Sequence, residues 1–202
     1  MPTQPTNITS QPDQSAYKEL PGDLAIWFFI FAELTVFAIF FISFAWMDSR
    51  NPEMFDAGKA TLHPIAGLIN TLALITSSYV LAVAVQAAQK GDAIACRRGF
   101  WLSISIASIY VVSKMWEYDQ LIEAGYDLST NNFYMFYFFT TGFHFMHVLL
   151  GMVILAILAV CLNKPNYVNS ELSTLESGAS YWHMVDLLWL ILFPLVYVIK
   201  IF

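Results

Sequence analysis

The chain has 202 residues, of which 58% are hydrophobic and only 12% are charged. Soluble domains carry about 25% charged residues, so this composition argues against a soluble globular domain and predicts a polytopic membrane protein. The net charge of −6 comes without a basic patch, which argues against nucleic acid as a partner.

The chain opens with a polar tail, residues 1–22, which is rich in Pro, Gln, Ser and Thr. The tail lacks a basic start, a short apolar core and a small-residue cleavage site. It is therefore expected to be disordered rather than to act as a signal peptide. Residues 23–202 are expected to form one membrane domain.

Five apolar stretches follow the tail, and each is long enough for a helix that crosses a bilayer, which needs about 20 residues. The expected spans are about 24–47, 62–89, 99–122, 133–161 and 178–200, with polar loops at 48–61, 90–98, 123–132 and 163–177. The predicted fold class is therefore all-α, a bundle of five transmembrane helices. We find no internal sequence repeat, which weakens an inverted-repeat transporter interpretation.

The distribution of Lys and Arg over the two sides sets the expected orientation. With the N-terminus inside, five of these residues lie inside and three outside. The inner set is Lys18, Lys90, Arg97, Arg98 and Lys164, and the outer set is Arg50, Lys59 and Lys200. The bias is modest and favours an N-terminus on the inner side.

The stretch 133–161 runs for more than 25 residues without a formal charge and carries one polar stripe. Thr140, His144, His147 and Gly151 are spaced i, i+4, i+7 and i+11, so they share one helical face. A membrane helix with such a face turns it toward protein rather than lipid. Other polar groups in apolar segments are expected to gather around this helix, namely Glu33, Asn70, Glu117, His183 and Asp186.

Glu33 interrupts the first apolar segment about ten residues from its start. A carboxylate at that depth costs about 2.5–3.5 kcal/mol or more unless it is paired, protonated or hydrated. One interpretation is an intramembrane carboxyl linked to protons or lipids. The other is a protonated Glu33 that stabilises the bundle by a hydrogen bond to a neighbouring helix. The sequence leaves both open.

Charged residues also occur near the outer end of the segment 99–122. Lys114 and Glu117 are spaced i, i+3, so a local ion pair is expected. Lys114 and Asp119 are predicted to lie at the charged, interfacial end of the helix. Glu117 has aromatic neighbours and is expected to lie deeper.

Histidines raise the hypothesis of a haem or metal site, because a carboxylate can orient an imidazole for a metal. His144 and His147 share one helical face, and His183 and Asp186 share another at i, i+3. The first pair is expected in the outer half of the membrane and the second at the inner side. Hydrogen bonds between helices are therefore favoured over ligation. No catalytic, cofactor-binding or metal-binding residue is expected, and the interhelical polar network comprises Asn70, Glu117, His144, His147, His183 and Asp186.

Five segments together resemble subunit III of the haem-copper oxidases, in the order found in that family. They are IFAELTVFAIFF (30–41), GLINTLALITSS (67–78), MWEYDQLIEAG (115–125), YFFTTGFHFMHVLLG (137–151) and YWHMVDLLWLILFPLVYV (181–198). The GFHxxHVxxG and YWHxVDxxW elements are the specific ones. The sequence YWHMVDLLWLILFP most resembles the NorE-like branch, which is associated with nitric oxide reductases.

The resemblance implies the five-helix form of the family and an accessory subunit without haem or copper of its own. Such a subunit packs against the haem- and copper-bearing catalytic subunit I, with subunit II as a further candidate partner. It stabilises the catalytic subunit and supports proton uptake in aerobic electron transport, in a bacterial-type inner (cell) membrane and among its lipids. Glu33 corresponds to the family's intramembrane carboxyl, and Glu117 falls in a WEY-type element. The family's histidine and aspartate positions correspond to His144, His147, His183 and Asp186.

Three alternatives remain at this point. The chain could be a NorE-like accessory protein of a nitric oxide reductase. It could be a proton-coupled transporter with Glu33 as its proton site, although no repeat supports this. It could also be an autonomous haem protein, which a stoichiometric Soret band in the purified chain would reveal.

Overall fold

The computed structural model describes residues 24–164 and 167–199, so the predicted disordered tail, 1–22, lies outside the described residues. The described elements are all helical. They are α1 (Leu24–Arg50), α2 (Pro52–Lys59), α3 (Pro64–Gln89), α4 (Ala93–Glu123), α5 (Asn132–Cys161), α6 (Tyr167–Ser170), α7 (Leu172–Phe193) and the π-helical segment η2 (Pro194–Val198).

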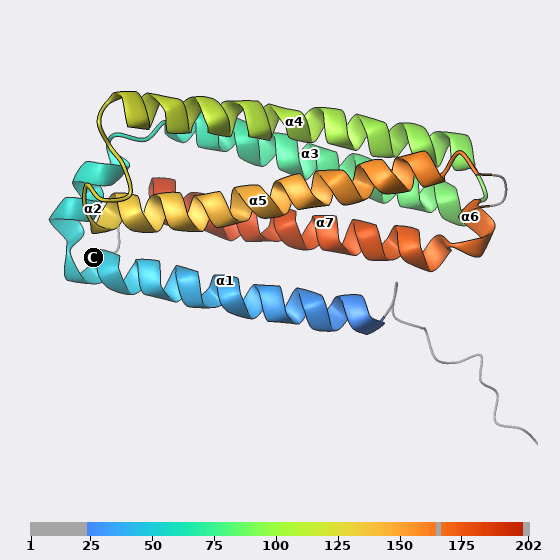
Figure 1. Ribbon diagram of the computed structural model, residues 1–202, viewed down its shortest axis with the longest axis horizontal. Helices are drawn as coiled ribbons and strands as arrows, with labels where there is room; N and C mark the ends of the chain where they lie inside the picture. The colour runs from blue at the N-terminus through green and yellow to red at the C-terminus, as the bar shows by residue number, and fades with distance from the viewer. Residues whose placement is uncertain (1–23, 165–166, 200–202) are drawn as a thin grey trace, which may run out of the picture.

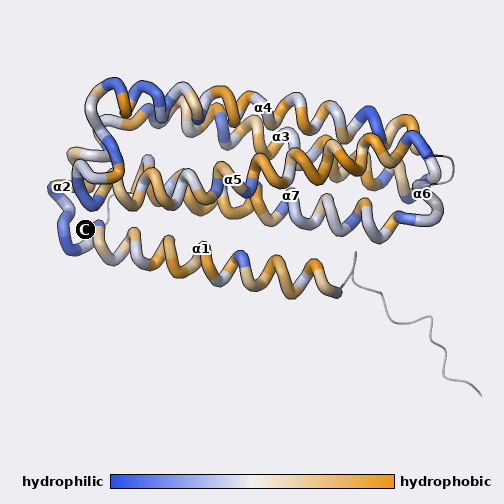
Figure 2. The backbone as a smooth tube through the Cα atoms, viewed as in Figure 1, coloured by the Kyte–Doolittle hydropathy of each residue, from blue (hydrophilic) through white to orange (hydrophobic). Residues whose placement is uncertain are grey.

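Five long helices, α1, α3, α4, α5 and α7, run side by side along the long axis of the molecule (Figure 1). Hydrophilic residues gather at the two ends of the bundle and apolar residues fill the length between them (Figure 2). Each of the five is long and apolar enough to cross a membrane. This confirms the predicted all-α, five-span membrane fold, whereas the orientation of the N-terminus stays a prediction.

Helix α1 lies along one side of the bundle and is the least embedded span (Figure 1). Only 11% of its most apolar stretch is buried within the protein, compared with 56% for α7. Phe37 and Phe44 on its inner face are fully buried, whereas Phe28 and Ile42 are exposed. Because the outer face of α1 is apolar as well, it offers a large surface to lipid or to a partner subunit.

Helices α3 and α4 form a close antiparallel pair. The hydroxyl of Ser77 in α3 donates to the backbone carbonyl of Ser103 in α4 at 2.9 Å, and the two hydroxyls lie 2.8 Å apart. A Cβ atom at Gly99 would lie 2.4 Å from the Cβ of Ala84 across the same interface. Small residues thus allow the two backbones to approach, as is typical of helix pairs in membranes.

Three predicted loops are shorter in the structure, because polar residues at the bundle ends continue or form helical turns. Loop 48–61 contains the short helix α2, which begins with Pro52, and the predicted loop 163–177 contains the start of α7 at Leu172. Helix α4 begins at Ala93, so most of the predicted loop 90–98 is helical. Asp92 caps this helix by accepting a hydrogen bond from the backbone N–H of Ala95 at 2.9 Å.

The last predicted span, 178–200, changes its helical type near its end. Pro194 has no N–H to continue the α-helical pattern, and α7 ends at Phe193. In the following segment the N–H of Ile199 donates to the carbonyl of Pro194 at 2.8 Å, which is the i to i+5 bond of a π-helix. This segment carries Tyr197, which is buried in the bundle.

The outer end of the bundle, in the predicted orientation, is held by a buried cation on α2. Lys59 forms an ion pair with Asp48 at the end of α1 and donates to the carbonyl of Ile199 at 2.7 Å. One charged side chain thus connects α1, α2 and the segment after η2.

In the nearby loop before α5, hydrogen bonds from the hydroxyl and backbone N–H of Ser129 hold the pKa of Asp127 below its usual range.

Candidate functional site

A fully buried lysine lies at the centre of a polar cluster between α4, α5 and η2. The Lys114 ammonium donates to Glu117 Oε2 at 2.8 Å, to the Tyr137 hydroxyl at 3.0 Å and to the Tyr197 hydroxyl at 2.6 Å. The Tyr197 hydroxyl in turn donates to Glu117 Oε2 at 2.7 Å. All three N–H bonds of the ammonium are therefore used. We call Lys114, Glu117, Tyr137 and Tyr197 the lysine cluster.

The prediction that Lys114 lies at the interfacial end of its helix is wrong, because its side chain is 0% exposed. Aromatic faces and hydroxyls surround the ammonium, and its nitrogen lies 4.8 Å from the ring centre of Tyr137 and 5.5 Å from that of Trp189. The expected i, i+3 ion pair with Glu117 is present. Asp119 is exposed, and its interfacial depth stays a prediction.

A second polar contact joins α1 to α5. His147 Nε2 lies 3.1 Å from Glu33 Oε2, and His147 Nδ1 lies 2.8 Å from the carbonyl oxygen of Phe143. A carbonyl can only accept, so Nδ1 carries a proton. Nε2 then either accepts a hydrogen bond from the protonated Glu33 carboxyl or, in an imidazolium, donates to the carboxylate. In both forms one proton is shared between Glu33 and His147.

This geometry predicts that Glu33→Gln keeps the protein folded. The glutamine amide can donate to His147 Nε2, so we expect a loss of stability below about 1 kcal/mol. Glu33→Leu leaves the imidazole nitrogen unpaired and should cost about 1–3 kcal/mol. Thermal unfolding of the three proteins in the same detergent measures both effects. A glutamine variant as unstable as the leucine variant would show that the negative charge itself is required.

Two further predicted polar residues, His144 and His183, contact different neighbours in the bundle. The His144 ring stacks on Trp189 with ring centres 5.3 Å apart and meets the ring of Tyr110 edge-on at 5.7 Å. His183 in α7 instead forms a hydrogen bond to Ser78 of α3, with Nδ1 and Oγ 2.9 Å apart. Glu33 thus contacts α5 through His147, and the lysine cluster contacts α5 through Tyr137. His183 instead contacts α3.

Asn70 in α3 is 0% exposed, and Asp186 lies one turn after His183 on α7, also buried. Across residues 24–164 and 167–199, no group of three or more His, Cys, Asp or Glu side chains is placed to hold a metal ion. Within the bundle, His147 and His183 make hydrogen bonds and His144 stacks on Trp189. This arrangement can hold and exchange protons on imidazole and carboxyl groups.

Sequence reasoning missed four aromatic members of this region: Tyr110, Tyr137, Trp189 and Tyr197. Tyr137 precedes His144 by two helical turns and lies on the polar stripe of α5, so the stripe could have been extended to it. For Tyr197 the sequence gives no signal, because its position depends on the π-helical turn after Pro194.

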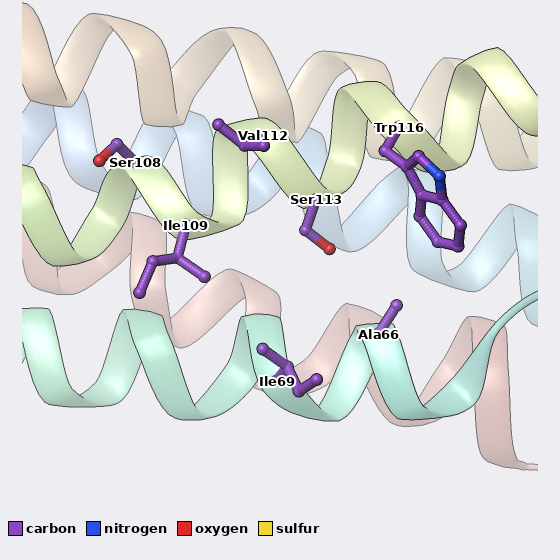
Figure 3. A pocket seen from close by; sticks show the side chains of 7 residues that line it. All are labelled: Ala66, Ile69, Ser108, Ile109, Val112, Ser113 and Trp116. Carbon is purple, nitrogen blue, oxygen red and sulfur yellow. The ribbon is translucent and has the colours of Figure 1, made fainter.

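A separate groove of about 690 Å³ runs along the surface between α3 and α4 (Figure 3). Figure 3 shows Trp116 covering one end of the groove, above Ala66. Its lining is Ala66, Ile69, Ser108, Ile109, Val112, Ser113 and Trp116. No member of the lysine cluster lines this groove, so it is distinct from the buried polar site.

Comparison with known proteins gives a family. The sequence profile described as "Cytochrome c oxidase subunit III" matches residues 17–200. A "Cytochrome c oxidase subunit 3" of Corynebacterium diphtheriae is 32% identical over 165 residues, which cover 82% of this chain and 80% of the relative. A protein of the same name from Thermostichus vulcanus is 33% identical over 135 residues, or 66% of each chain. A "Heme-copper oxidase subunit I+III" of Aeropyrum pernix is 29% identical over 181 residues, covering 87% of this chain and 22% of the relative. The chain therefore belongs to the cytochrome c oxidase subunit III family.

Proposed function

We propose that this chain is the accessory, non-catalytic subunit III of a respiratory haem-copper terminal oxidase. The observation that carries the proposal is the match of the subunit III profile to residues 17–200, which includes all five spans. The Aeropyrum pernix relative, named as a subunit I+III, supports catalytic subunit I as the partner. Subunit II is a further partner in this proposal.

In this role the chain stabilises the catalytic subunit and supports its proton uptake, while haem and copper reside in the partner. The contacts of the histidines support that division. His147 has one ring nitrogen beside Glu33 and the other beside the carbonyl of Phe143, and His183 Nδ1 lies 2.9 Å from Ser78 Oγ. The shared proton of Glu33 and His147 supports a proton-linked role, because it lies at the contact of α1, the least embedded span.

The proposed setting is a bacterial cell (inner) membrane, with the N-terminus on the inner side as the Lys and Arg distribution indicates. Membrane lipids are expected as further partners. The groove between α3 and α4 supports this, because its apolar lining suits an acyl chain (Figure 3).

A second candidate rests on the resemblance noted in the sequence. The segment YWHMVDLLWLILFP (181–194) resembles the NorE-like branch of the family. In that case the chain would be an accessory protein of a nitric oxide reductase, and the complex would consume NO in place of O₂.

Purifying the oxidase complex with and without this chain tests the proposed role. We expect the same haem spectrum in both preparations, because the cofactors belong to the partner. The preparation without the chain should unfold at a lower temperature and take up protons more slowly during O₂ reduction. A complex with unchanged stability and proton uptake would contradict the accessory role.

A further inference from the structure

Nine buried side-chain nitrogen and oxygen atoms have no hydrogen-bond partner among the residues that the structure describes, and seven of these atoms lie on α3, α4 and α5. They belong to five side chains that are each at most 1% exposed. The atoms are both amide atoms of Asn70, the hydroxyl oxygens of Tyr110 and Thr140, Oε1 of Glu117 and both ring nitrogens of His144. Buried polar atoms are nearly always hydrogen-bonded, so this concentration requires an explanation.

The helix registers bring these side chains to neighbouring levels. Ser77 of α3 faces Ser103 of α4, and the two helices are antiparallel. Asn70 precedes Ser77 by seven residues and Tyr110 follows Ser103 by seven, so both lie two turns along and at the same level.

The same holds between α4 and α5. Lys114 contacts Tyr137 at 3.0 Å. One turn back along α4 and two turns on along α5, the rings of Tyr110 and His144 meet at 5.7 Å. Thr140 lies between Tyr137 and His144 on the inner face of α5, and it is the smallest side chain of that row. The five side chains therefore lie at successive levels of the bundle between Asn70 and the lysine cluster.

Trp189 of α7 forms one wall of this path. Its ring centre lies 4.9 Å from that of Tyr110 and 5.3 Å from that of His144, and the ammonium of Lys114 lies 5.5 Å from it. The indole N–H is already used, because it donates to Thr71 Oγ1 at 3.0 Å. Two of the side chains with unpartnered atoms, Tyr110 and His144, thus lie against a ring that offers them no hydrogen bond.

We propose that Asn70, Tyr110, Thr140, His144 and Glu117 bind a short row of internal water molecules beside Trp189. A buried water makes about three hydrogen bonds to polar groups that would otherwise be unsatisfied, and these five side chains supply both donors and acceptors. The row joins the lysine cluster to the centre of the bundle and gives Glu117 and His144 a path for proton exchange. This inference concerns the interior of the chain, so it does not depend on which complex the chain belongs to.

X-ray radiolytic labelling of the purified complex tests the water row, because hydroxyl radicals formed from bound water modify the side chains beside it. We expect Tyr110 to be labelled severalfold faster than Phe44, although both are 0% exposed. Phe44 is the reference, since its ring packs against the rings of Phe55 and Phe133. Equal labelling of Tyr110 and Phe44 would overturn the proposal.

The variant Asn70→Leu provides a second measurement on the same complex. It replaces the buried amide by an apolar side chain of similar size, so labelling at Tyr110 should fall severalfold. Thr76→Val is the matched control. Thr76 is an exposed residue of the same helix, and its hydroxyl donates to the backbone carbonyl of Leu72 one turn earlier. Unchanged labelling in a folded Asn70→Leu complex would place the water elsewhere and contradict the assignment of this side chain.

Discussion

Replacing Lys114 by Met is expected to lower the free energy of unfolding by about 3–5 kcal/mol, because it leaves a buried, uncompensated carboxylate. Glu117 is 1% exposed, and Lys114 is its charged partner at 2.8 Å. The same change removes the hydrogen bonds that Tyr137 and Tyr197 accept from the ammonium. Thermal or denaturant unfolding in a mild detergent, followed by tryptophan fluorescence, measures the loss.

Two further variants separate the ion pair from the loss of a lysine. Lys114→Met combined with Glu117→Gln removes both charges, and we expect it to recover most of the lost stability, since a neutral pair has no unpaired charge. Lys90→Met makes the same substitution at an exposed position and should change stability by less than about 0.5 kcal/mol. A double variant no more stable than the single one would show that the two charges are not coupled.

Replacing Gly99 by Ala is expected to cost about 1–3 kcal/mol by forcing α3 and α4 apart. The new methyl group would lie 2.4 Å from the Cβ of Ala84, which belongs to a short side chain and can move only with its backbone. Gly142→Ala is the matched control, because a Cβ there meets no atom within 4 Å. Since alanine favours a helix over glycine by about 0.8–1.0 kcal/mol, this control should be neutral or stabilising.

Unfolding measurements on the two alanine variants distinguish packing from helix propensity. The expected order of stability places Gly142→Ala at or above the parent protein and Gly99→Ala clearly below it. If both substitutions stabilise equally, the close approach of α3 and α4 is not required by the fold.

Hydrophobic run lengths predicted the five spans, because a bilayer sets the length of a spanning helix. Periodicity placed Thr140, His144 and His147 on one face of α5, and the i, i+3 spacing predicted the Lys114–Glu117 pair. These successes share one cause, since each depends on geometry within a single helix. The short helix α2 was missed because polar turns at a membrane surface resemble loops in hydropathy.

The partners of the polar residues could not be predicted, because they come from different helices. The depth of Lys114 follows from Tyr137 on α5 and from Tyr197, which reaches the cluster only through the π-helical turn. The hydrogen bond of Glu33 with His147 and that of Ser78 with His183 likewise depend on helix packing. Helix periodicity shows which face is polar, whereas packing decides what that face contacts.

Affinity purification of the full chain from native membranes in mild detergent, with O₂ and NO consumption assayed on the eluate, tests the account most directly. We expect a haem-copper catalytic subunit to co-purify and the complex to consume O₂. Consumption of NO with the same kind of partner would instead select the nitric oxide reductase alternative. Recovery of no haem-containing partner from well-preserved membranes would contradict the assignment as an oxidase subunit.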